Sequence, residues 1–141
     1  MGHRILILAL AMLGLSVHQA WAEQCEANLR QTKHYQSLRN ETSEFVASDV
    51  PLEAKLSAIT TLEAAGLNCR ELIDAAIMRM TAYERAGQFA QAMEPIQEIF
   101  SANELPAMQR HFARWIVDLY RLNDDDTGAE PYIDYLVENA S

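Results

Sequence analysis

The chain is poor in the residues from which most catalytic and metal sites are built. It has 2 cysteines and 4 histidines among 141 residues, and only His34 and His111 lie beyond the first 22 positions. Neither histidine has a patterned acid or nucleophile beside it, and two cysteines without a histidine cluster give too few ligands for zinc. The 20 acidic residues leave room for a catalytic carboxylate pair, but the sequence singles out none. We therefore expect no enzyme, no metal and no cofactor.

The chain also lacks an apolar run long enough to cross a membrane. The longest, Ile5–Val17, has 13 residues, whereas a spanning helix needs about 20. The basic pair His3-Arg4 precedes it and Ala20-Trp21-Ala22 follows it, which is the order of a secretory signal and its cleavage site. We predict that residues 1–22 are a cleaved signal peptide, with an uncleaved membrane anchor as the alternative.

Basic residues are scarce in the remaining chain. Residues 23–141 hold 10 basic and 20 acidic side chains, a net charge of −10. Phosphate backbones and anionic lipids repel such a chain, so we expect no nucleic-acid binding and no stable membrane insertion after signal cleavage. The prediction is a periplasmic or secreted protein with one domain at residues 23–141.

The two cysteines, Cys25 and Cys69, are an even number in a chain expected to be exported. Oxidising compartments favour disulfides, so we predict a Cys25–Cys69 bond, with two free buried thiols as the alternative. The bond would close a loop of about 45 residues and stabilise the fold by roughly 3–4 kcal/mol in the chain-entropy model.

Only 5 glycines and 4 prolines occur, and they separate apolar runs of helical period, with no strand-like alternation. The pattern predicts an all-α fold of six antiparallel helices with short connections. Asn68 with Glu71 and Thr127 with Glu130 form the pattern of capping boxes. The expected helices cover about 24–47, 51–65, 69–86, 88–101, 104–122 and 128–139.

A five-residue pattern recurs 37 positions later in the chain. It consists of an aromatic residue late in one helix, a turn residue four positions on, and a small residue in the next helix. The small residue allows close approach of two antiparallel helices, and the aromatic ring fills the space beside that contact. The pattern comprises Tyr83, Gly87, Ala92, Ile96 and Ile99, repeated as Tyr120, Asp124, Ala129, Ile133 and Leu136.

The segment Tyr83–Ala92 reads Tyr-x3-Gly-x4-Ala, which resembles the core of the tetratricopeptide repeat. Ala129-Glu130-Pro131-Tyr132 is similar to second helices of that family. The resemblance covers about Ile73–Ser141, although Asp124 replaces the turn glycine and the spacing exceeds the usual length of about 34. It implies stacked helical hairpins: a degenerate one at 24–67, then 69–102 and 104–140. An unrelated six-helix bundle is the alternative.

In that family the first helix of each hairpin lines a groove that binds peptides. Carried over by position, the resemblance implies a groove lined by Asp74, Ile77, Thr81, Glu84, His111, Arg114, Asp118 and Arg121. Arg114 and Arg121 stand out in an acidic chain, because local positive charge steers and binds carboxylates. The alternative is that both arginines pair with Asp118 and neighbouring acids.

The run Asn123–Gly128 places oxygen donors as in an EF-hand calcium loop. However, the first position is not aspartate and the twelfth, Asp134, is not glutamate, so an acidic turn before the last helix is the favoured interpretation.

The functional prediction is a non-enzymatic exported adaptor that binds another protein or a peptide. The alternative is a periplasmic immunity or inhibitor protein that neutralises a toxin or hydrolase, which the acidity, the signal and the disulfide fit equally well.

Overall fold

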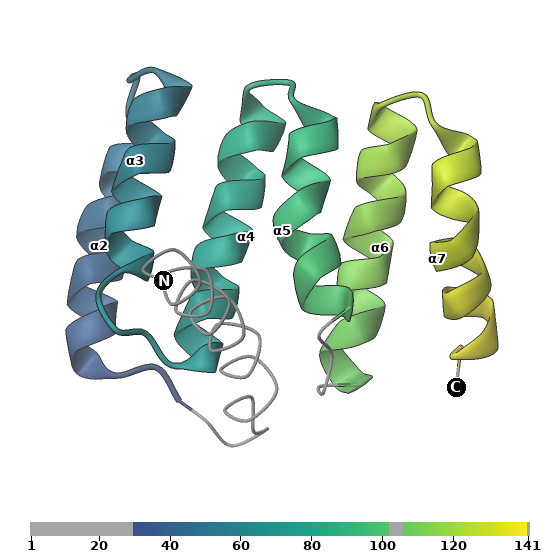
Figure 1. The fold of residues 1–141 in the computed structure, drawn as a ribbon, viewed down its shortest axis with the longest axis horizontal. Helices are drawn as coiled ribbons and strands as arrows, with labels where there is room; N and C mark the ends of the chain where they lie inside the picture. Colours follow the sequence, from purple (N-terminus) through teal and green to yellow (C-terminus); the bar gives the residue numbers. More distant parts are fainter. Residues whose placement is uncertain (1–29, 102–105, 141) are drawn as a thin grey trace, which may run out of the picture.

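Six α-helices make up the part of the chain that the computed structural model describes, residues 30–101 and 106–140. They are α2 (Lys33–Ala47), α3 (Leu52–Glu63), α4 (Cys69–Arg85), α5 (Phe89–Ser101), α6 (Pro106–Leu122) and α7 (Asp126–Glu138). Figure 1 shows them in chain order, each antiparallel to the next, and no strand occurs in the described ranges. The all-α prediction is confirmed. The predicted signal peptide and Cys25 lie outside the described residues.

Side-chain caps decide where the helices begin. Asn68 and Glu71 form the predicted capping box at the start of α4. The predicted helix over residues 24–47 is wrong at residues 30–32, because Thr32 has extended backbone and its Oγ1 accepts the N–H of Tyr35, so α2 begins at Lys33. The prediction for Thr127 is also wrong, since Asp125 caps α7 by accepting the N–H of Gly128.

One offset relates the hairpins to each other. The bounds of α4 and α6 differ by 37 residues at both ends, and so do those of α5 and α7. The first hairpin follows the same period: α3 begins 37 residues before α5, and α2 corresponds to residues 70–84 within α4. The described helices therefore form three hairpins of equal period. The repeated pattern in the sequence revealed only the last two.

The turns after α4 and α6 have the same hydrogen bonds. The N–H of Gly87 donates to the carbonyl three residues earlier at 3.0 Å, and that of Gln88 to the carbonyl of Tyr83 at 2.9 Å. Asp124 and Asp125 repeat both bonds, at 3.0 and 2.9 Å. This is the Schellman motif, which needs a left-handed residue; φ is 73° at Gly87 and 53° at Asp124. Aspartate tolerates that region better than most side chains, and Asp124 takes the glycine's place.

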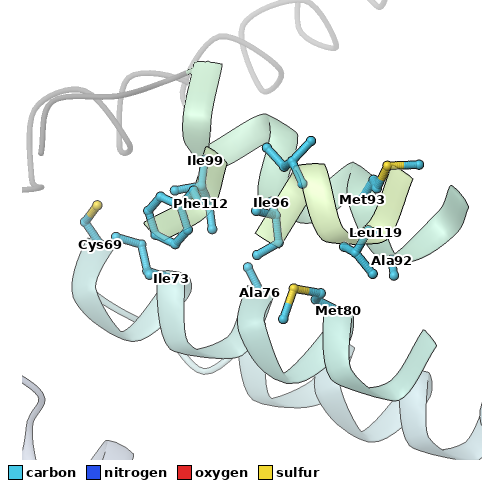
Figure 2. Packing of buried hydrophobic residues seen from close by; sticks show 11 residues of the cluster. Cys69, Ile73, Ala76, Met80, Ala92, Met93, Ile96, Ile99, Phe112 and Leu119 are labelled. Carbon is cyan, nitrogen blue, oxygen red and sulfur yellow. The ribbon is translucent and has the colours of Figure 1, made fainter. Parts of the chain in front are cut away.

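The largest core cluster joins α4, α5 and α6. In Figure 2, Ile73, Ala76 and Met80 of α4 point toward side chains of α5 and α6. Ala92 is fully buried there, and Tyr83 packs against the same cluster. These contacts agree with the predicted packing of an aromatic ring near a small residue at the α4–α5 hairpin.

Side-chain hydrogen bonds link equivalent helices of neighbouring hairpins. Three hydrogen bonds show this, and they join residues 39, 38 and 35 positions apart: Tyr35 to Asp74 between α2 and α4, Arg70 to the sulfur of Met108 between α4 and α6, and Gln97 to Tyr132 between α5 and α7. These contacts are compatible with stacked hairpins. Within the described ranges, none of the helices is long and apolar enough to cross a membrane.

Candidate functional site

The eight residues predicted to line a groove lie at matching positions of α4 and α6. Asp74, Ile77, Thr81 and Glu84 precede His111, Arg114, Asp118 and Arg121 by 37 residues each. We call the surface formed by these eight residues, together with the adjoining side of α2, the first-helix face. On α4 only Glu84 is exposed and the other three are half-buried, whereas all four residues of α6 are exposed.

Asp74 is engaged within the protein. Its Oδ2 accepts the hydroxyl of Tyr35 at 2.6 Å and the Nε of Arg39, also at 2.6 Å. Tyr35 is only 1% exposed, and burial, followed by the bond to Asp74, raises the pKa of its hydroxyl far above the usual value. Asp74 therefore joins α2 to α4 and fixes the position of Arg39.

The raised pKa of Tyr35 predicts a stability loss at alkaline pH. Unfolded Tyr35 ionises near pH 10 while the folded hydroxyl stays protonated, so its contribution is complete below pH 10 and declines above it. The free energy of unfolding of the unmodified chain should fall relative to Tyr35→Phe by up to about 1.4 kcal/mol per pH unit above pH 10. Urea unfolding of both proteins from pH 8 to 11 measures this. Parallel curves would contradict the account.

A depression of about 200 Å³ opens between α2 and α4 on the first-helix face. Val46, Ile77 and Met78 give it an apolar part, and the polar side chains around it include Arg39, Ser43, Thr81 and Arg85. It has room for one side chain of a bound segment. The sequence prediction included Asp74, Ile77 and Thr81 but missed the α2 residues. The 37-residue offset does not supply them, because it pairs Asp74, Ile77 and Thr81 with Ser37, Asn40 and Glu44.

The α6 part of the face presents two exposed cations. Arg114 and Arg121 are exposed, and neither forms a salt bridge within the described residues, where the ion pairs are Arg39–Asp74 and Arg79–Glu63. The predicted alternative, pairing with Asp118, is not formed. Both guanidinium groups are thus open to a ligand carboxylate.

Charge is segregated between the two kinds of helix. The first helices α2, α4 and α6 hold eight basic and six acidic residues, a net charge of +2. The second helices α3, α5 and α7 hold one basic and eight acidic residues, a net charge of −7. The first-helix face is therefore the less negative side of an acidic protein, and α6 alone has three arginines against one aspartate.

Acidic residues of the turn between α6 and α7 shape the backbone of that turn. Asp124 has the left-handed conformation and the Asp125 carboxylate caps α7, so Asp125, the third position of the proposed calcium loop, has a structural role. In the described parts of the chain, no three histidine, cysteine or acidic side chains are grouped to hold a metal ion.

We found no match to this chain among protein-family models, curated proteins or solved structures.

Proposed function

We propose that the chain is a tetratricopeptide-like, exported interaction module without enzymatic activity, which binds an acidic segment of another protein along its first-helix face. The observation that carries the proposal is a pair of exposed arginines, Arg114 and Arg121, which form no ion pair with any residue that the structure describes and lie on the most basic of the six described helices. A guanidinium group binds a carboxylate by charge-assisted, often bidentate, hydrogen bonds.

The α2–α4 depression complements these cations. Its apolar residues Val46, Ile77 and Met78 can take an apolar side chain while Arg85 lies beside it. An extended segment with an apolar anchor and acidic residues further along would therefore contact both parts of the face. Repulsion from the acidic second helices favours this orientation of an acidic partner.

The test begins with affinity capture of partners from an envelope extract, followed by binding measurements with each purified partner. The double variant Arg114→Glu/Arg121→Glu should weaken binding at least about tenfold, or ~1.4 kcal/mol. Lys55→Glu, at the only basic residue of the second helices, is the control for the same kind of charge change and should have little effect. Equal weakening by both variants would overturn the assignment of the face.

An inhibitor or immunity protein is the second candidate, favoured by the charge of −7 on the second helices. That surface suits a basic enzyme. An inhibitor would form a tight one-to-one complex with a single cationic toxin or hydrolase and abolish its activity, and the α6 charge reversal would leave that complex intact.

We further propose the Cys25–Cys69 disulfide and export by the secretory route. Asn68, directly before Cys69, donates from its side chain to the carbonyl of Arg30, and Glu71 accepts from Thr32. These bonds hold the chain five residues after Cys25 beside the start of α4. Such anchoring supports the pairing, because a disulfide needs Cα atoms within about 7 Å.

The disulfide is expected to matter for stability. Reduction, or the double variant Cys25→Ser/Cys69→Ser, should lower the free energy of unfolding by about 3–4 kcal/mol. Intact mass of the exported protein should correspond to a chain that begins at Glu23 and lacks two hydrogens. An N-terminus at Met1 together with free thiols would refute both parts.

A further inference from the structure

In the first two hairpins, one side of the second helix packs against the first helix of the next hairpin: α3 against α4, and α5 against α6. On α3, Leu52, Leu56 and Ile59 pack with Met78 and Ala82 of α4. On α5, the residues 37 positions later are Phe89, Met93 and Ile96, and they pack in the cluster that includes α6. These three positions are therefore apolar in α3 and in α5, the two second helices that are followed by another hairpin.

On α7 two of these three positions are charged. Asp126 and Glu130 stand where α5 has Phe89 and Met93, and both are exposed. Asp134, which replaces Gln97, is exposed as well. The third position keeps an apolar residue, Ile133, which is half-buried, and Val137 four residues further on is 71% exposed. The α7 end face, defined as these five residues, is a short apolar strip flanked by three carboxylates.

A second copy of the chain is a poor occupant for this face. A head-to-tail stack would place α2 of a second copy against α7 of the first. In α2, Glu41 and Phe45 occupy the positions at which Met78 and Ala82 of α4 contact α3. Glu41 is exposed, so it would approach the carboxylates of α7 and be repelled. Charged residues at both ends of the stack oppose continuation of the repeat.

We propose that the α7 end face binds a basic amphipathic helix of a partner protein. The helix lies antiparallel to α7, as α4 lies against α3 and α6 against α5. Its apolar side covers Ile133 and Val137, and its lysine or arginine side chains reach Asp126, Glu130 and Asp134. The first-helix face differs in charge and in the helices that form it, so this site is independent of the proposed function.

The probe is a synthetic 18-residue amphipathic helical peptide with leucines on one side and lysines on the other. Its binding to the full mature chain is measured by fluorescence anisotropy. Glu130→Lys/Asp134→Lys should weaken binding at least about tenfold, and Val137→Asp at least threefold. The control Glu94→Lys/Glu98→Lys makes the same charge change at two exposed acids of α5 and should change affinity less than threefold.

Three outcomes overturn the proposal. One is equal weakening by both lysine pairs, which means unspecific charge attraction. Another is the absence of peptide binding below 1 mM. The third is sedimentation of the free chain as a dimer that Val137→Asp dissociates, which makes a second copy the occupant.

Discussion

Glu71→Ala should lower the free energy of unfolding by about 3–4 kcal/mol, the largest loss expected from any single side chain at a helix end. Glu71 is 3% exposed, and its carboxylate accepts three hydrogen bonds: from the N–H of Thr32 at 2.8 Å, from the Thr32 hydroxyl at 2.9 Å, and from the N–H of Asn68 at 3.0 Å. Charge-assisted bonds of this kind contribute about 1.5–3 kcal/mol each, and partners left unsatisfied add to the loss. Glu71 thereby ties the starts of α2 and α4 together.

Urea unfolding of the oxidised protein measures the change. Glu84→Ala, at an exposed acid of the same helix, is the matched control and should stay within about 0.5 kcal/mol. Glu71→Gln should give an intermediate loss, because its amide nitrogen cannot accept from Thr32 while its oxygen still accepts from Asn68. A loss below about 1 kcal/mol for Glu71→Ala would show that Glu71 does not join the two helices.

Gly128→Ala should destabilise the protein by about 2–3 kcal/mol, although the same change in an open helix stabilises by about 1 kcal/mol. A Cβ at Gly128 would lie 2.4 Å from Cε1 and 2.6 Å from Cδ1 of Tyr120, and 2.7 Å from the capping carboxylate of Asp125. The Tyr120 ring cannot move away easily, because its hydroxyl accepts a hydrogen bond from Gln97 and its ring packs against Tyr132.

A double-mutant cycle with Tyr120→Leu isolates this contact. If the ring causes the clash, Gly128→Ala should cost less than about 1 kcal/mol in the Tyr120→Leu background. Thr127→Ala, at the exposed neighbouring position, controls for the helix start and should have a small effect. An unchanged cost in the leucine background would remove the Tyr120 ring as the cause.

The sequence predicted the helices well where local signals are strong. Gly66 and Gly87 end α3 and α4 with φ of 73° at both positions, and the Asn68–Glu71 capping box opens α4. It failed where two signals compete within one turn. Thr127 has a glutamate three residues on, as a capping box requires, but Asp125 accepts the N–H of Gly128 first and the helix starts earlier.

The candidate face was predictable from α4 and α6 but not from α2. In α2 the pattern that marks the repeat is lost, because Val46 stands where the other hairpins have Tyr83 and Tyr120, and Lys55 where they have Ala92 and Ala129. The bond from Arg39 to Asp74 joins residues 35 positions apart. No local pattern reveals such a pair, so its part in shaping the α2–α4 depression required coordinates.

Hydrogen–deuterium exchange of the oxidised chain, alone and with a partner purified from the envelope, tests the central claim most directly. The account predicts slower exchange on binding in α4 and α6, with little change in α3 and α5, and loss of that protection in Arg114→Glu/Arg121→Glu. Protection confined to α3 and α5, unaffected by the arginine variants, would show that the partner binds the second helices and would contradict the account.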